Sequence, residues 1–203
     1  MGLFDFLLGN KTASNIEVVD DRIWISQQAK FNGLAKELVE RPNSDSVAVL
    51  LIGHFSDTVE RLDSIAAEYK GDVPVMATLA NKLTVDIASK LNLGPKDIIE
   101  LIVAERHPFL SADEKLLQFA DELPCRCRVS HHLALNDPLL KVFCGEWVIR
   151  ILDSLGMKED EAIESSMVSR RVKQAQQKIE SSAFGNLETE SAEKWIKKNM
   201  PND

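Results

Sequence analysis

Several features that mark specialised classes of protein are scarce in this sequence of 203 residues. No apolar run approaches the roughly 18 residues of a membrane-spanning helix, so we expect no transmembrane segment. The three cysteines, Cys125, Cys127 and Cys144, are an odd number, which disfavours a complete disulfide framework. A reducing cytoplasm fits this cysteine usage best, with buried, idle thiols as the main interpretation and a redox or metal role as the alternative.

The chain also has fewer basic residues than acidic ones. The chain has 24 Lys and Arg residues against 32 Asp and Glu residues, a net charge of -8. Such a chain repels nucleic-acid phosphates unless its cations gather on one face, so we expect no nucleic-acid partner.

The sequence lacks the familiar catalytic motifs. It has no Gly-x-Ser-x-Gly elbow, no metalloprotease pair of His residues four apart, and no complete phosphate-binding loop. Gly9-Asn10-Lys11-Thr12 is superficially similar to such a loop, but no Gly stands five residues before Gly9 and no strand precedes it. We therefore assign no catalytic, cofactor-binding or metal-binding residue from a motif, and we expect no cofactor.

Apolar runs that alternate with helical patterns are what the sequence does contain. Strands are expected at 21–26, 47–53, 73–79, 98–104 and 126–130. Helices are expected between them, one opening at Asp57 with Glu60 and another at Ser111 with Glu114, as capping boxes. This order predicts an α/β fold with one parallel sheet and right-handed crossovers.

The last third of the chain has helical periodicity. Asp137 and Pro138 are expected to open a helix, with an apolar stripe at Leu140, Phe143, Trp147, Ile151 and Leu155. A second helix is expected at 166–180, followed by a polar, flexible stretch and a helical turn or two around Trp195. The expected division is an apolar or disordered N-terminal segment at 1–20, an α/β domain at 21–156, and a helical extension and tail at 157–203.

Polar residues follow several of the expected strands and form the candidate strand-end cluster. Its members are His54, Glu105, Arg106, His107 and His131. The carboxyl ends of parallel strands are where open α/β sheets bind ligands, and His and Glu there could coordinate Zn²⁺ or act as acid and base. Adjacent His131 and His132 point to opposite faces of a strand, so both cannot serve one metal without a bend. Capping and ion-pair roles are the competing interpretation.

A basic stretch lies within the expected helix at 166–180. Between Met167 and Ile179 there are four cations and no acid: Arg170, Arg171, Lys173 and Lys178. They form either a solvated helix face or a docking surface for an acidic partner or lipid headgroups.

From Asp21 to about Phe184 the chain resembles the second nucleotide-binding domain of SecA, the preprotein translocase motor ATPase, and the start of its helical scaffold. The resemblance is carried by DRIWISQQAKFNGLAKEL (21–38), VAVLLIGHFSDTVERL (47–62), AERH (104–107), LALNDPLLKVF (133–143) and LGMKEDEAIESSMVSRRVKQAQQKIE (155–180). It implies a RecA-like, P-loop-NTPase-like topology with a helical C-terminal extension.

Departures from that family decide the functional expectation. In the family an arginine- and glycine-rich motif follows the Glu-Arg-His strand, whereas residues 108–129 here contain no Gly and no Arg before Arg126. The glycine-rich motif before the strand at Ile98 and the Walker sequences of the first motor domain are missing. Phosphoryl transfer needs a phosphate cradle, Mg²⁺ ligands and a charge-stabilising Arg.

The resemblance thus implies a degenerate, stand-alone, noncatalytic domain of the bacterial cytoplasm. We expect it to bind a protein partner, in the Sec export machinery or as a homodimer of this chain. The alternative is an enzyme that uses the strand-end cluster on a small molecule or a metal.

Overall fold

The computed structural model describes residues 15–40, 45–144 and 160–200. Its strands are β1 (Ile16–Val18), β2 (Arg22–Trp24), β3 (Ala48–Gly53), β4 (Val75–Leu79), β5 (Ile98–Val103), β6 (Arg126–Ala134) and β7 (Ile163–Glu164). Its helices are α1 (Gln27–Val39), α2 (Ser56–Glu68), α3 (Asp86–Lys90), α4 (Leu110–Glu122), α6 (Ser166–Ser182) and α7 (Ala192–Asn199). The short helical turns are η1 (Ala80–Lys82) and the π-helical η2 (Leu140–Cys144).

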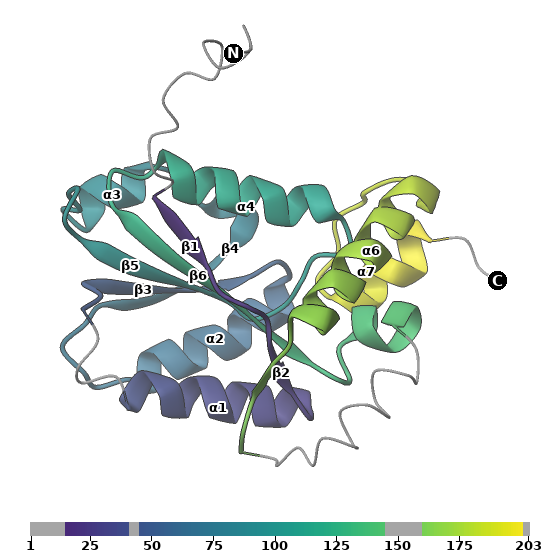
Figure 1. Cartoon of the computed structure of the whole chain (residues 1–203), viewed down its shortest axis with the longest axis horizontal. Helices are drawn as coiled ribbons and strands as arrows, with labels where there is room; N and C mark the ends of the chain where they lie inside the picture. Colours follow the sequence, from purple (N-terminus) through teal and green to yellow (C-terminus); the bar gives the residue numbers. More distant parts are fainter. Residues whose placement is uncertain (1–14, 41–44, 145–159, 201–203) are drawn as a thin grey trace, which may run out of the picture.

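The strands form one seven-stranded sheet in the order β4-β3-β5-β6-β2-β7 (Figure 1). β1 and β2 lie one after the other along β6, and both run parallel to it. All pairs are parallel except that of β2 with β7. The expected α/β class with a parallel sheet is therefore confirmed.

The two central apolar runs explain why the sheet has layers on both faces. Every residue of β3 and β5 is buried, as expected for continuous apolar strands in a parallel sheet. Alternate residues of β3 face opposite ways: Leu50 and Ile52 pack with α3 and α4, and Val49 and Leu51 pack with α1 and α2. The two helical layers lie above and below the sheet in Figure 1.

A third apolar cluster lies at the carboxyl end of the strands. It joins Ile23 and Leu133 of the sheet to Val172 and Ile179 of α6 and to Trp195 of α7. The expected apolar side of the helix at 166–180 is confirmed, because Val168, Val172, Ala175 and Ile179 are all buried. α6 and α7 therefore cover the edge of the sheet at which its strands end (Figure 1).

Three local expectations were wrong. β6 continues to Ala134, so His131 and His132 lie within the strand and not at its exit. α4 begins at Leu110 without a side-chain cap, and the Ser111 hydroxyl donates to the Glu180 carboxylate of α6. α2 begins at Ser56, which places Asp57 inside the first turn. In each case a tertiary contact, not local sequence, fixes the end of the element.

Some expectations fall on residues outside the described ranges. These include the apolar residues Phe4, Phe6, Leu7 and Leu8 of the N-terminal segment and the stripe beyond η2. β1, within the segment 1–20, was not expected.

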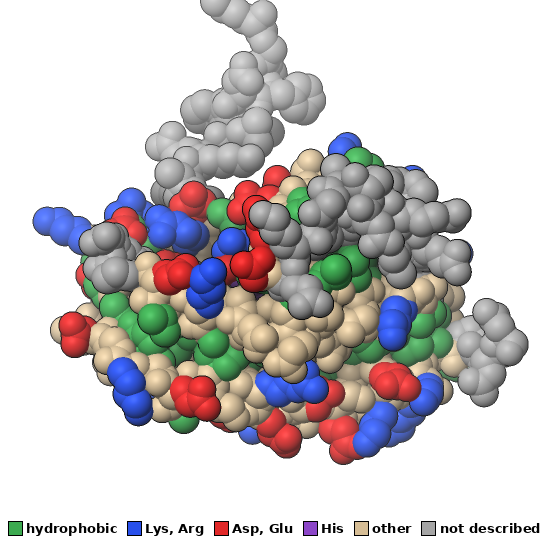
Figure 2. Space-filling model, turned by 90° about the horizontal axis from the view of Figure 1, so that it is seen from below, with side chains coloured by type: hydrophobic (Ala, Val, Ile, Leu, Met, Phe, Trp, Pro, Cys, Tyr) green, Lys and Arg blue, Asp and Glu red, His purple; other side chains and the backbone are tan. Residues whose placement is uncertain are grey.

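Two surface and composition expectations can be compared with the described residues. No helix among them is long and apolar enough to cross a bilayer. On the face formed by α1 and α2, acidic and basic side chains alternate over the part that is described (Figure 2).

Cys125 and Cys127 are buried free thiols, and burial raises the pKa of the Cys127 thiol to about 12, which supports their interpretation as idle.

Candidate functional site

The structure brings three of the five members of the strand-end cluster, His54, Arg106 and His107, into contact with one carboxylate. Asp113, in the first turn of α4, is buried. Its oxygens lie 2.9 Å from His54 Nε2 and 3.1 Å from Arg106 NH1, and they accept the backbone N–H of His107 at 3.2 Å. Burial alone would raise the pKa of Asp113, but contact with His54 and the charge of Arg106 outweigh it and hold that pKa well below its usual range.

Arg106 is shared between two buried acids. Its NH2 lies 2.5 Å from Asp21 Oδ1 and its NH1 lies 3.1 Å from Asp113 Oδ2. Burial would lower the pKa of Arg106, but the charges of Asp113 and Asp21 raise it. The guanidinium is thus held by two protein carboxylates, and the side chain is 15% exposed.

His131 completes this ion cluster without forming a hydrogen bond. The side chain is fully buried, its Nδ1 lies 4.0 Å from Asp21 Oδ1, and neither ring nitrogen has a hydrogen-bond partner among the described residues. Burial lowers the pKa of His131 well below its ordinary value. His132 points to the other face, where its Nδ1 accepts the indole N–H of Trp24 at 3.2 Å.

His107 is packed in an aromatic group rather than exposed to a ligand. Its ring stacks on Phe55 with centroids 5.5 Å apart and meets the edge of Trp195 of α7 at 5.5 Å. Burial, and then the neighbouring His54, lower the pKa of His107 to about 4. The imidazole is therefore neutral at physiological pH.

Glu105 is turned away from this cluster toward the start of α2. Its Oε1 accepts the backbone N–H groups of His54 at 2.8 Å and Phe55 at 3.0 Å, and its Oε2 accepts the Thr58 hydroxyl at 2.9 Å. Burial raises the pKa of this carboxyl. Because the N-cap residue Phe55 offers no side-chain acceptor, Glu105 supplies the cap from a neighbouring strand.

The most important residues that sequence reasoning missed are Asp21, Asp113 and Gln176. The Gln176 amide of α6 donates to the carbonyl of His107 at 2.7 Å and to Asp113 at 2.8 Å. One signal was available: Asp113 lies on the same helical face as Leu116 and Ala120, so an acid interrupts an apolar stripe.

The geometry does not favour the metal alternative. Among the described residues, no group of three or more His, Cys, Asp or Glu side chains is arranged to hold a metal ion. His54 contacts Asp113, His107 packs in an aromatic group, and His131 lies beside Asp21, so the three side chains have different surroundings.

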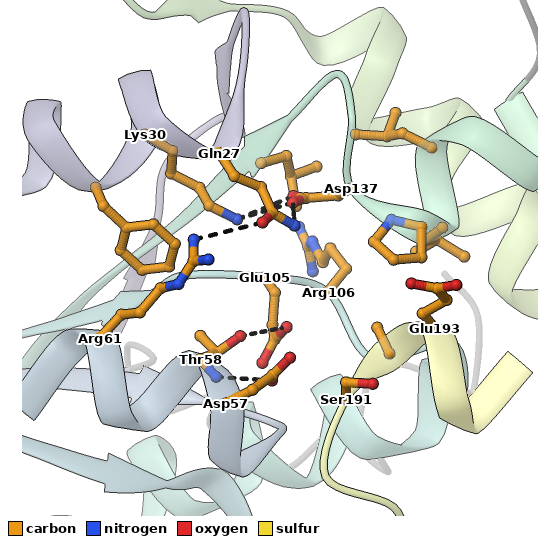
Figure 3. Close-up of a pocket in the computed structure, with 16 residues that line it drawn as sticks. Gln27, Lys30, Asp57, Thr58, Arg61, Glu105, Arg106, Asp137, Ser191 and Glu193 are labelled. Carbon is orange, nitrogen blue, oxygen red and sulfur yellow. Dashed lines mark hydrogen bonds and ion pairs between the residues drawn. The ribbon is translucent and has the colours of Figure 1, made fainter.

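Two hollows adjoin the cluster. One, of about 210 Å³, lies between α1, α2, residues 133–140 and the start of α7 (Figure 3). The other, of about 740 Å³, lies between the end of β4, α4 and residues 186–190. The start of α7 and the segment before it border both hollows.

The four cations of α6 lie outside the strand-end cluster. Arg170, Arg171, Lys173 and Lys178 are all exposed on the side of α6 that faces away from the sheet. The structure thus presents them to solvent, and whether a partner binds them is a separate question.

Comparison with known proteins finds SecA across most of the chain. The SecA translocase subunit of Parabacteroides distasonis is 26% identical over 191 residues, which cover 82% of this chain and 17% of that protein. SecA of Amoebophilus asiaticus is 24% identical over 189 residues, 81% of this chain and 17% of that protein. SecA of a Psychrobacter species is 37% identical over 86 residues, 42% of this chain and 9% of that protein.

No protein-family model matches the chain. At 17% of the length of the first two relatives, it spans about a sixth of a SecA subunit. The resemblance to SecA that the sequence predicted is confirmed, and the chain is SecA-like over about four fifths of its length.

Proposed function

We propose that this chain is a noncatalytic, SecA-like binding domain that acts in protein export as an adaptor. The observation that carries the proposal is the state of Arg106. This residue belongs to the AERH segment (104–107) through which the chain resembles SecA, and its guanidinium is held between Asp21 and Asp113. A charge-stabilising arginine must reach the phosphates of a bound nucleotide, and one held in a double ion pair is not available for that role.

The sequence that runs from the end of β5 through α4 into β6 supports the same proposal. Residues 108–129 have no glycine that would let the backbone approach a phosphate closely. α4 instead contributes Asp113, whose negative charge neutralises Arg106. Arg106 is thus paired with a carboxylate of the same chain, whereas the charge-stabilising arginine of a motor ATPase contacts the nucleotide.

The exposed face of α6 is the proposed docking surface for an export partner. Its cations stand on a chain of net charge -8, so they form a local positive surface suited to an acidic partner. A cytoplasmic location follows from this proposal.

ATP hydrolysis by the purified chain tests the noncatalytic part. Phosphate release with Mg²⁺ and ATP is expected to stay at the level of a protein-free blank. Turnover that disappears in Arg106→Ala would contradict the proposal.

The docking part needs a separate experiment. The full chain, immobilised, is expected to retain purified SecA or the membrane translocase, and a variant with Arg170, Arg171, Lys173 and Lys178 changed to Glu is expected to lose it. The control carries Lys36→Glu and Lys70→Glu, two exposed positions on α1 and after α2. Equal retention of both variants would remove α6 from the proposal.

Metal analysis and light scattering separate the remaining alternatives. Stoichiometric Zn²⁺ that is lost in His107→Ala would favour a metal enzyme. A dimer that persists on dilution and dissociates in the α6 variant would make a second copy of this chain the partner.

A further inference from the structure

The smaller hollow has apolar lining residues and a charged rim. Its apolar lining residues include Phe31, Leu133, Leu139 and Leu140. Asp57 and Arg61 of α2 and Glu193 of α7 border it on others (Figure 3). The hollow thus combines apolar surface with several converging polar groups, which are the groups that fix a bound small molecule in one orientation.

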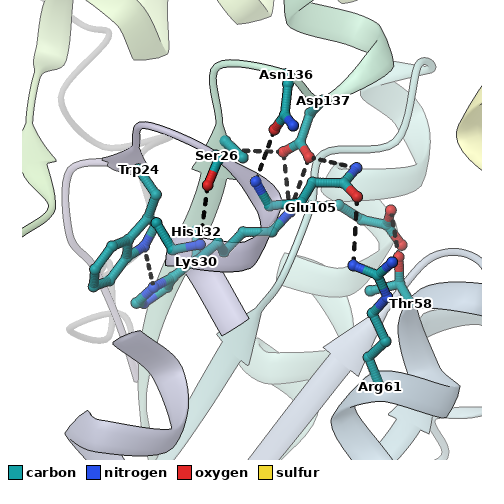
Figure 4. Close-up of polar contacts among 12 residues, drawn as sticks. Trp24, Ser26, Lys30, Thr58, Arg61, Glu105, His132, Asn136 and Asp137 are labelled. Atoms are coloured by element: carbon teal, nitrogen blue, oxygen red, sulfur yellow. Dashed lines mark hydrogen bonds and ion pairs between the residues drawn. The ribbon is translucent and has the colours of Figure 1, made fainter. Parts of the chain in front are cut away.

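The charges at the base of this hollow are already satisfied within the protein. Lys30 Nζ lies 3.0 Å from both oxygens of Asp137 (Figure 4), and Glu105 accepts three hydrogen bonds. Arg106 is held by Asp21 and Asp113. These groups fix the shape of the hollow, but they leave ligand recognition to the rim.

Asp57 and Arg61 on the rim are opposite charges held apart. They are one turn apart on α2, a spacing at which an acid and a base commonly pair. Arg61 instead lies over the ring of Phe31, 5.0 Å from its centroid, with NH1 3.5 Å from Gln27 Oε1. Asp57 accepts the backbone N–H of Thr58 and lies nearer Ser191 at the start of α7 (Figure 3).

Such a separated pair is complementary to a ligand that carries both charges. Burial raises the pKa of the Asp57 carboxyl, although the hydrogen bond from Thr58 and the charge of Arg61 act to lower it. Arg61 is held by an aromatic face and an amide, so its remaining N–H groups can bind a carboxylate without losing an ion pair. A cation near Asp57 and a carboxylate near Arg61 would satisfy both.

From this geometry we propose that the hollow between α1, α2 and α7 binds a small zwitterion with an apolar side chain, of the class of the apolar α-amino acids. The ammonium group contacts Asp57, the carboxylate contacts Arg61, and the side chain packs against the apolar residues of the lining. The volume of about 210 Å³ is below the roughly 300 Å³ at which pockets for drug-sized ligands begin, which suits a molecule of this size. A polyphosphate does not fit, because Asp57, Glu105 and Glu193 would repel it.

This site goes beyond the proposed export role and does not depend on it. The α6 docking surface lies outside the hollow, so loss of one function leaves the other measurable.

Thermal unfolding and calorimetric titration of the full chain test the proposal with L-leucine, L-phenylalanine and L-valine as probes. At saturating concentration, at least one is expected to raise Tm by about 2–4 °C. The matched probes for L-leucine are 4-methylpentanoic acid, which lacks the ammonium group, and 3-methylbutylamine, which lacks the carboxylate. Each is expected to bind at least about tenfold more weakly, because one charged contact is lost.

Variants assign the effect to the rim. Arg61→Gln and Asp57→Asn are expected to weaken binding by about tenfold or more while the unliganded chain stays folded. Lys36→Gln on α1 and Asp63→Asn on α2, both exposed and outside the hollow, are the controls and are expected to bind normally. The proposal is overturned if none of the three amino acids binds saturably, if the single-charge analogues bind as well, or if Arg61→Gln binds like the controls.

Discussion

Lys30 and Asp137 form an ion pair that is almost completely withdrawn from water. Lys30 Nζ lies 3.0 Å from both carboxylate oxygens, and the two side chains are 2% and 9% exposed. Asp137 also accepts the backbone N–H of Ala134 and the amide of Gln27. One carboxylate thus connects α1 to the end of β6.

Replacing Lys30 by Met is expected to lower the free energy of unfolding by about 3–5 kcal/mol, because Asp137 is left as a buried charge without its cation. Urea denaturation measures the loss. Lys36→Met, at an exposed position on the same helix, is the control and is expected to change stability by less than about 0.5 kcal/mol. Equal effects of the two substitutions would contradict the role given to the pair.

Gly33 is expected to tolerate no side chain. A Cβ there would lie 1.9 Å from a ring carbon of Trp24, so Gly33→Ala is expected to cost about 1–3 kcal/mol although Ala favours helices. The double variant with Trp24→Phe, which vacates that space, is expected to lose less than the sum of the two single variants. Strict additivity in denaturation experiments would show that the ring and the helix do not compete for this volume.

The pKa of His107 predicts acid sensitivity. Because that pKa is about 4 in the folded chain and 6.5 in its ordinary state, the unfolded chain binds more protons between these values. The contribution of His107 to the free energy of unfolding is complete above pH 6.5. It falls by up to about 3 kcal/mol as the pH drops toward 4. Glu105 and Asp21 have the opposite effect. Because their pKa values are raised, they lower the free energy of unfolding as the pH rises above the ordinary range of a carboxyl group.

A variant isolates the histidine contribution from these acids. His107→Phe keeps an aromatic ring against Phe55 and Trp195 but cannot take up a proton. The stability difference between wild type and His107→Phe, measured by denaturation at pH 8.0 and 5.5, is expected to shift in favour of the variant at the lower pH. A difference independent of pH would mean that His107 does not titrate in this way.

Trp195 is expected to hold α7 against the sheet. The side chain of Trp195 is buried, with 1% of the residue exposed. Its ring meets that of Phe109 edge to face with centroids 5.0 Å apart, and its N–H donates to Asn186 Oδ1 at 2.8 Å. Trp195→Ala is expected to cost about 3–5 kcal/mol and to speed amide hydrogen exchange in α7. Ile196→Ala, at a half-buried neighbour, should have a smaller effect. Unchanged exchange in α7 of Trp195→Ala would show that other contacts hold the helix.

The sequence predicted the elements whose signal is local. The continuous apolar runs of β3 and β5 and the stripe at Val168, Val172 and Ile179 depend on burial at fixed spacing, and the structure contains them as expected. The resemblance to SecA was recognised from fragments in the right order. Such signals can be read from the sequence because each depends on residues that lie close together along the chain.

Contacts between distant segments were not accessible in this way. Glu105, two residues after β5, caps α2, and Asp21 and Asp113 meet at Arg106 although they are far apart in the sequence. β1 has only three residues, too few for a periodic pattern, and it forms because β6 offers a free edge. The sequence thus predicted that His54 and Glu105–His107 follow β3 and β5, but it did not predict their pairing, which depends on tertiary structure.

Gln176 reaches from α6 into the ion cluster and donates to Asp113 and to the carbonyl of His107. A lineage that lost this helix through an early stop codon would expose buried ions of the sheet as well as an apolar surface. The buried side of α6 must therefore be inherited together with the strands that it covers, whatever its outward residues bind.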